Sequence, residues 1–301
     1  MFGIKSKLNI EHITLDLYAT YLIKYFYQKY LIRTKGQHQL LFIIGCQRSG
    51  TSLINRIFAR DLNVSVYRES SRLSSNDSSP IAKNKLRLNS FNDVKEALDK
   101  DKAPFIVFKP LVETQNAPDL LDYFSESKAL WMYRGYRDVV NSLLKKFSLN
   151  VGIRNLKSIV ENSQENWYSE KVPESIREII LQHFSEEMSP YDAAALFWFV
   201  RNQLFYELQL HRNSRILMCR YEDLVTQPNQ VMQNIYQFVG AHDYSDGNNW
   251  EVHSNSVRKG HSVQLLPAIE KLCSDLLVRL DHTYENQKVC FDKPIEISIN
   301  R

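Results

Sequence analysis

The chain has 301 residues and a nearly balanced charge, with 38 Lys and Arg residues against 34 Asp and Glu residues, a formal net charge of +4. Its hydrophobic share of 44% and charged share of 24% are typical of a folded globular protein and exclude a disordered or fibrous chain. Nine glycines and nine prolines are few for this length, which favours long regular elements and excludes collagen-like or blade-repeat architectures.

The N-terminal part of the chain predicts one amphipathic helix, because residues 10–33 carry apolar side chains at helical spacing with basic residues among them. We expect an N-terminal helical arm over residues 1–36 and a single domain over residues 37–301. The helix either packs on the domain or docks on a membrane surface or a partner. No uncharged apolar run of membrane-spanning length and no signal-peptide pattern is present, so we expect a cytoplasmic protein.

From Leu40 onward, short apolar runs alternate with helical patterns. Such runs are typical of strands buried on both faces of a parallel sheet. The predicted strands are 40–44, 105–108, 129–133 and 215–221. The predicted helices are 51–60, 117–124, 137–147, 193–210 and 229–239. This alternation indicates an α/β fold with a mostly parallel central sheet flanked by helices, whose ligands bind beyond the carboxyl ends of the strands.

Two other features of the chain complete its organisation. Residues 70–92 are rich in Ser and Asn and predict a long loop, which is a candidate lid facing the substrate. The four cysteines show no C-x-x-C spacing, which indicates neither a zinc site nor a disulfide framework.

The strongest local signal is the segment IIGCQRSGTSLINRIF, residues 43–58, a buried strand followed by a glycine-bracketed turn and a helix. Backbone amides of such a turn and the N-terminus of its helix bind anions. The ATP-binding form, G-x-x-x-x-G-K-[ST], adds a lysine and a hydroxyl that binds magnesium. Here Thr51 replaces the lysine and Arg48 supplies a cation from within the turn. This exchange favours a phosphosulfate over a nucleoside triphosphate with its metal.

The turn resembles the donor-binding loop of the sulfotransferases that use 3′-phosphoadenosine 5′-phosphosulfate (PAPS). In that family an R-S-G-T-[ST] loop binds the 5′-phosphosulfate. The matching residues here are Arg48, Ser49, Gly50, Thr51 and Ser52. The resemblance implies a P-loop NTPase-like sulfotransferase fold, PAPS as the co-substrate and no metal.

A second motif of this family binds the 3′-phosphate with an Arg at a strand end and a Ser eight residues later. Arg134 and Ser142 have this spacing. A planar guanidinium directly after a predicted strand suits a phosphate. Lys146 lies four residues beyond Ser142 on the same helical face, where tyrosylprotein-type members carry an Arg. The alternative for Arg134 is a surface pair with Asp138.

Two further segments resemble the family near the C-terminus. A Y-E-D-L motif begins at Tyr221 and is followed by Pro228 and Gly240. We expect a structural role for it, because Pro and Gly at these places suit the start and the end of a helix. Arg258 and Lys259 resemble the R-K-G tripeptide that holds the 3′-phosphate in cytosolic members. A solvated basic loop is the alternative for these two residues.

The transfer step needs a base for the proton of the acceptor. Cytosolic arylsulfotransferases use a His, but the corresponding segment FKPLVE, residues 108–113, contains none. Tyrosylprotein and some carbohydrate members use a Glu, and Glu69 stands 21 residues past Arg48, as in the tyrosylprotein pattern. The alternative is a surface carboxylate paired with a neighbouring arginine, and Glu113 is the reserve candidate for the base.

The transfer step also needs a positive group for the leaving oxygen. Lys109 follows the predicted strand 105–108 and matches the lysine of K-D-P in tyrosylprotein members. We therefore predict a sulfotransferase that moves a sulfuryl group from PAPS to an acceptor hydroxyl of a carbohydrate, lipid or small metabolite, without nucleic acid as a partner. The alternatives are a P-loop small-molecule kinase and a non-catalytic nucleotide-binding protein that docks through its N-terminal helix.

Overall fold

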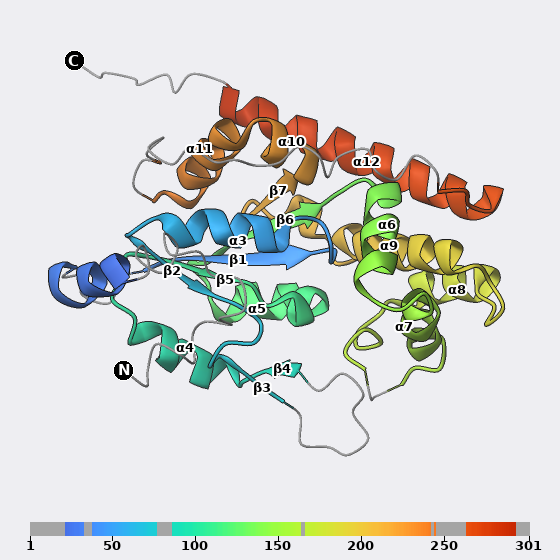
Figure 1. The fold of residues 1–301 in the computed structure, drawn as a ribbon, viewed down its shortest axis with the longest axis horizontal. Coiled ribbons are helices and arrows are strands. Elements are labelled where there is room, and N and C mark those ends of the chain that lie inside the picture. The colour runs from blue at the N-terminus through green and yellow to red at the C-terminus, as the bar shows by residue number, and fades with distance from the viewer. Residues whose placement is uncertain are drawn as a thin grey trace.

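The structure, a computed structural model, describes residues 22–32, 38–76, 86–163, 166–241, 244 and 263–292. Its centre is a five-stranded parallel sheet with the strand order β2-β5-β1-β6-β7 (Figure 1). These strands are β1 (Gln39–Gly45), β2 (Val64–Tyr67), β5 (Phe105–Phe108), β6 (Lys128–Tyr133) and β7 (Ile216–Arg220). A separate antiparallel pair consists of β3 (Ser74–Asn76) and β4 (Leu86–Leu88).

Apolar side chains on both faces of the strands hold the sheet in the centre of the fold. Because successive side chains of a strand point to opposite faces, β1 supplies two separate cores. Phe42 and Ile44 belong to one core, and Leu41 and Ile43 belong to the other. All four side chains are fully buried, and each stabilises the fold by about 1.5–3 kcal/mol. A sheet of this kind requires helices on both faces.

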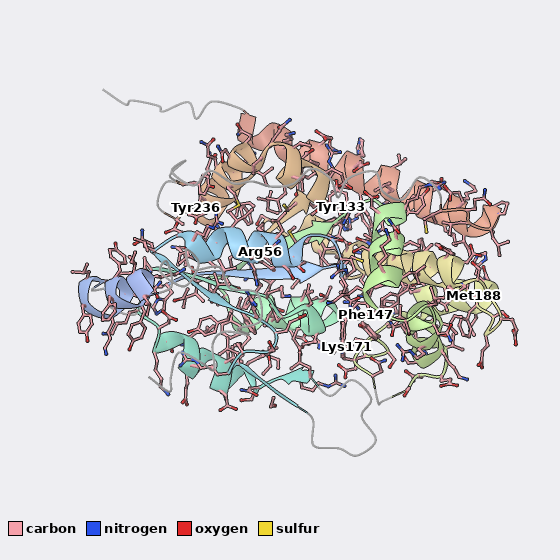
Figure 2. All side chains as sticks on the ribbon, in the orientation of Figure 1. Arg56, Tyr133, Phe147, Lys171, Met188 and Tyr236 are labelled. Carbon is pink, nitrogen blue, oxygen red and sulfur yellow. The ribbon has the colours of Figure 1, made fainter. Side chains whose placement is uncertain are left out.

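The core that contains Leu41 and Ile43 includes side chains from three helices, and the core that contains Phe42 and Ile44 includes side chains from seven. The first three are α3 (Thr51–Arg60), α10 (Tyr221–Thr226) and α11 (Pro228–Val239). The other seven are α4 (Phe91–Asp99), α5 (Ala117–Tyr123), α6 (Tyr136–Lys146), α7 (Val151–Val160), α8 (Glu174–His183), α9 (Pro190–Glu207) and α12 (Pro267–Asp292). The chain also forms a short π-helix, η2 (Tyr27–Leu31), and two short 3-10 helices, η3 (Leu111–Asn116) and η4 (Leu210–Arg212). Figure 2 shows side chains filling the space between the sheet and these helices.

The predicted α/β fold class is confirmed, and the four predicted strands agree with the observed ones to within one residue at each end. The predicted helix 51–60 has the observed bounds of α3. The predicted helix 193–210 is shifted, because α9 begins at Pro190 and ends at Glu207. The Ser189 hydroxyl accepts a hydrogen bond from the backbone N–H of Asp192 and caps the helix there.

The predicted loop over residues 70–92 is wrong where the chain forms β3, β4 and the start of α4, whereas residues 70–73 and 89–90 are irregular as predicted. Ser74 pairs with Leu88, and Asn76 pairs with Leu86, across the β3–β4 ladder. Helix α4 then begins at Phe91, inside the predicted loop. The strands have three residues each, and β3 is polar throughout while β4 reads Leu-Arg-Leu, so neither strand is long enough for hydrophobic alternation to identify it. Residues 77–85 lie outside the described part of the chain.

Helix α12 was not predicted from the sequence, although its buried side chains recur at helical spacing. These side chains are Ile269, Cys273, Leu276, Leu280 and Tyr284. They pack against the core next to α9 and β7.

Residues 22–32, a part of the predicted N-terminal helix, pack against the domain. The Lys24 ammonium donates to the Ala59 carbonyl oxygen over 2.8 Å, and the Tyr27 hydroxyl donates to the Asn63 side-chain oxygen over 3.1 Å. The rest of the predicted arm lies outside the described residues, so the division into arm and domain stays a prediction. Within the described part of the chain, no helix has the length and apolar character needed to cross a membrane.

Candidate functional site

The polar residues predicted for the site gather where the parallel strands end. Each of the five central strands is followed at its carboxyl end by a residue that the sequence analysis singled out for a motif or a role. In strand order from β2 to β7, these residues are Glu69, Lys109, Gly45, Arg134 and Tyr221. Gly45 is the last residue of β1, and the other four lie just after their strands. Since the strands are all parallel, these ends lie along one edge of the sheet.

The loop between β1 and α3 has a positive φ at Gly45, Arg48 and Gly50, and two of these three positions are glycines. Gly45 has a φ of 117° and Gly50 a φ of 87°. A Cβ atom at Gly45 would lie 2.4 Å from the carbonyl oxygen of Met132, so β1 and β6 approach too closely for a side chain there. Gly50 immediately precedes α3 as its N-terminal cap. A strand, a loop and a helix N-terminus in this order form an anion-binding geometry.

We expect Gly50→Ala to lower the free energy of unfolding by roughly 2–5 kcal/mol, because strain at the positive φ and overpacking add. The new Cβ would lie 2.4 Å from Cδ2 of Tyr221. Urea unfolding measures the effect. Gly240→Ala is the matched control, since Gly240 has a φ of 74° and nothing within 4 Å of the added atom. Equal losses in the two variants would contradict the importance of the Tyr221 contact.

Arg48 of the loop and Ser142 of α6 meet directly, with the Arg48 Nε donating to the Ser142 hydroxyl over 3.0 Å. They line a pocket of about 330 Å³. The remaining lining residues are Arg134, Asp138, Asn141, Lys145 and Lys146. Within the described residues, this lining therefore holds four cationic side chains and one carboxylate. Such a pocket attracts anions.

Arg134 is 6% exposed and lies at 3.3 Å from the Asp138 carboxylate. The ion pair with Asp138 is thus present, as in the alternative for Arg134, but it is buried instead of lying on the surface. Burial lowers the pKa of the Arg48 guanidinium, and the nearby Arg134 charge lowers it further. An anion between Arg48 and Arg134 would relieve this repulsion. Arg137, by contrast, pairs with Glu270 of α12 at 2.6 Å.

The Y-E-D-L segment, for which we expected a structural role, contacts both halves of this pocket. The Tyr221 ring lies close to Gly50 of the loop and 4.2 Å from the Arg134 guanidinium carbon. The next residue, Glu222, accepts a hydrogen bond from the Gly135 backbone N–H over 3.1 Å. Its structural role thus includes positioning Arg134. The place of the Y-E-D-L segment at the carboxyl end of β7 could have indicated this positioning role from the sequence.

Glu69 and Lys109 form an ion pair, with 3.4 Å between the Glu69 carboxylate and the Lys109 ammonium. The pairing of β2 with β5 brings them together, because the Lys109 backbone N–H donates to the Tyr67 carbonyl oxygen. Lys109 is 8% exposed, so its ammonium is largely removed from water. A carboxylate beside a buried ammonium can accept a proton while the ammonium stabilises a negative oxygen.

Glu113, the reserve candidate, lies in a different pocket. Its carboxylate accepts a hydrogen bond from the Asn116 amide over 2.8 Å, and burial raises its pKa. This second pocket has a volume of about 470 Å³. It is lined by Phe91, Glu113, Asn116, Asp119, Asn162, Ser169, Glu170 and Lys171.

A polar cluster that was not predicted from the sequence lies next to the loop. The Gln47 side-chain amide donates to the Tyr168 hydroxyl over 2.6 Å. Arg201 of α9 is 1% exposed and contacts Gln115 at 3.3 Å and the Trp167 ring at 5.1 Å. Two of its three guanidinium nitrogens have no hydrogen-bond partner among the described residues. The sequence signal that could have indicated this cluster is Arg201 itself, a charged residue within the apolar run of α9.

The remaining predicted site residues differ in their placement. Ser49 and Thr51 are buried, whereas Ser52 is exposed at the start of α3. Arg258 and Lys259 lie outside the described residues. The described part of the chain contains no group of three or more His, Cys, Asp and Glu side chains that could hold a metal ion.

Comparisons with solved structures find sulfotransferases of low sequence identity. One similar solved structure is the sulfotransferase domain of the Synechococcus PCC 7002 olefin synthase, with 14% identity, a TM-score of 0.50, and coverage of 82% of this chain and 96% of that one. The sulfotransferase domain from the curacin biosynthetic pathway has 17% identity, a TM-score of 0.47, and coverage of 82% and 99%. Mouse sulfotransferase SULT7A1, complexed with PAP, has 12% identity, a TM-score of 0.41, and coverage of 87% and 91%.

A search of curated protein sequences finds no match. The family model of the sulfotransferase domain matches residues 39–259, which include the loop, the β2, β5 and β6 strand ends and the Y-E-D-L segment. This match spans most of the 301-residue chain. The chain therefore belongs to the sulfotransferase family and has its P-loop-like α/β fold.

Proposed function

We propose that this sulfotransferase takes its sulfuryl group from PAPS and transfers it to an acceptor hydroxyl. The observation that carries the proposal is the Arg48–Ser142 hydrogen bond of 3.0 Å inside the cationic pocket. It joins the candidate 5′-phosphosulfate loop to the candidate 3′-phosphate helix. A nucleotide with anionic groups on both its 3′ and 5′ positions needs these two sets of cations in one site.

Each side chain has a role in this proposal. Arg48 and the loop of Ser49, Gly50, Thr51 and Ser52 bind the 5′-phosphosulfate, with backbone amides as donors. Arg134, Ser142 and Lys146 bind the 3′-phosphate, and Arg258 and Lys259 are further candidates for it.

Glu69 accepts the proton of the acceptor hydroxyl as its oxygen attacks sulfur. The new O–S bond forms while the bond from sulfur to the bridging phosphate oxygen breaks, and the Lys109 ammonium stabilises the charge left on that oxygen. The products are a sulfate ester and adenosine 3′,5′-bisphosphate (PAP). Alignment and charge stabilisation supply most of the rate, as in phosphoryl transfer.

The kinase alternative fits the residues less well. Thr51 occupies the position at which the ATP-binding loop has its lysine, so the cation that reaches the outer phosphates is missing there. Arg48 instead extends to Ser142 of α6, beside Arg134. This arrangement serves a second anionic group on the nucleotide.

Calorimetric titration with two nucleotides tests the donor. We expect PAP to bind without metal and magnesium ATP to bind at least about tenfold more weakly, since one charge-assisted contact corresponds to about that factor. Labelled sulfate should then pass from PAPS to an acceptor in a panel of saccharides, alcohols and phenols. Tight binding of magnesium ATP together with indifference to PAP would overturn the proposal.

A further inference from the structure

The 470 Å³ pocket that contains Glu113 has no role in the proposed donor chemistry. Its volume falls within the range of small-molecule sites, about 300–1,000 Å³. Lys171, labelled in Figure 2, is one of its exposed lining residues and locates the pocket in the fold.

Turn η3 is a wall shared by this pocket and the donor site. The Thr114 hydroxyl of η3 accepts a hydrogen bond from the Gly45 backbone N–H over 3.3 Å, at the start of the donor loop. Its neighbours Glu113 and Asn116 line the pocket instead. Lys109 precedes this turn by two residues. The turn therefore connects the proposed leaving-group lysine to the pocket along the chain.

The segment 166–171 is a second shared wall. Its Tyr168 hydroxyl contacts Gln47 of the donor loop over 2.6 Å, while Ser169 and Glu170 line the pocket. The Gln115 amide of η3 donates to the Trp167 carbonyl oxygen over 2.7 Å and ties the two walls together. Two independent segments thus place the pocket next to the donor loop.

The lining of the pocket is rich in hydrogen-bond acceptors. Its cationic neighbours are already engaged, since Lys171 pairs with Asp119 and Arg87 pairs with Glu170. Glu113, which is 9% exposed, accepts a hydrogen bond from the neutral amide of Asn116.

The side-chain oxygen of Asn116 is buried and has no hydrogen-bond partner among the described residues. A buried acceptor of this kind favours a ligand that brings donors. An anionic acceptor substrate would instead meet the Glu113 carboxylate, whose charge no ion pair within the described lining neutralises.

We propose that this pocket binds the acceptor, and that the acceptor is a neutral, hydroxyl-rich saccharide. The inference rests on the proposed sulfotransferase function and names its substrate class. The saccharide hydroxyls donate to the Glu113 carboxylate and the Asn116 oxygen, and Phe91 supplies an apolar surface for the sugar ring. Lipids and steroids fit poorly, because Phe91 is the one hydrophobic side chain in the described lining.

Steady-state transfer from PAPS to lactose, glucosamine, 4-nitrophenol and octanol tests the pocket. We expect lactose to be the best acceptor. Glu113→Gln should raise the KM for lactose by roughly ten- to hundredfold, since one hydrogen bond to a charged group is lost. The kcat for lactose and the KM for 4-nitrophenol should stay near the wild-type values. Asn116→Ser should raise the KM for lactose in the same direction.

The matched control is Glu96→Gln on α4, whose exposed side chain lies outside the pocket lining. Calorimetry with PAP separates the two proposals, because unchanged PAP binding in Glu113→Gln shows that the fold and the donor site are intact. Preference for 4-nitrophenol or octanol in a PAP-binding enzyme would overturn the saccharide assignment alone. Preference for glucosamine would show that the carboxylates of the pocket bind an ammonium group, and it would overturn the assignment of a neutral saccharide. A fall in kcat for all acceptors in Glu113→Gln would place Glu113 in the transfer step.

Discussion

Glu69→Gln should lower the turnover number by about 10²–10⁴-fold, the range expected for the loss of a general base. Glutamine keeps the shape of the side chain and an oxygen for the Lys109 ammonium, which lies 3.4 Å from the carboxylate. It is therefore preferable to alanine, which would leave a buried ammonium without this partner. PAP affinity should stay unchanged, because Glu69 does not line the cationic pocket. Initial rates with labelled PAPS and calorimetry with PAP give the two quantities.

Glu113→Gln is the comparison variant for this experiment, since it makes the same substitution at the reserve candidate for the base, in the other pocket. With 4-nitrophenol as acceptor, we expect the Glu113 variant to turn over at a rate close to the wild type. If Glu69→Gln were fully active while Glu113→Gln were inactive with every acceptor, the base would be Glu113.

Arg134→Ala should weaken PAP binding by roughly ten- to hundredfold, which corresponds to the loss of a charge-assisted contact with the 3′-phosphate. Adenosine 5′-phosphosulfate lacks that phosphate, so its affinity should change little. The test is the difference between the losses of affinity for the two ligands, because the variant also removes the Asp138 ion pair and the Tyr221 contact. Those losses act on both ligands equally.

Calorimetric titration of both nucleotides measures the Arg134 effect, and thermal unfolding shows whether the variant is folded. Arg137→Ala is the neighbouring control, because Arg137 pairs with Glu270 and is absent from the pocket lining. Its PAP affinity should stay close to that of the wild type. Equal weakening for PAP and adenosine 5′-phosphosulfate in Arg134→Ala would contradict its assignment to the 3′-phosphate.

The fold could be predicted where one physical cause dominated the sequence. Strands such as Phe105–Phe108 are buried on both faces, and this requirement leaves a continuous apolar run that is easily recognised. The strands β3 and β4 have no such requirement, because they are three residues long and lie outside the central sheet. Their pairing depends on a ladder between segments on either side of residues 77–85, which composition does not reveal.

The candidate site could be predicted in its parts but not in its geometry. Arg48 and Ser142 came from separate motifs, and their contact depends on β1 and β6 being neighbours in the sheet. Glu69 and Lys109 likewise meet because β2 pairs with β5. Tyr168 reaches the donor loop from an irregular segment whose position depends on side-chain packing, so no spacing rule could identify it.

Arg201 has a consequence for the stability of the whole molecule. A guanidinium that is 1% exposed and has two nitrogens without partners among the described residues opposes folding, since charges lose hydration in the interior. The aromatic ring of Trp167 offsets a part of this loss. Burial raises the pKa of the Cys46 thiol, which follows β1, and the Arg201 charge lowers this pKa because the interior screens charges weakly. Arg201 thus lowers the stability of the fold while it places a positive charge near Cys46 of the loop.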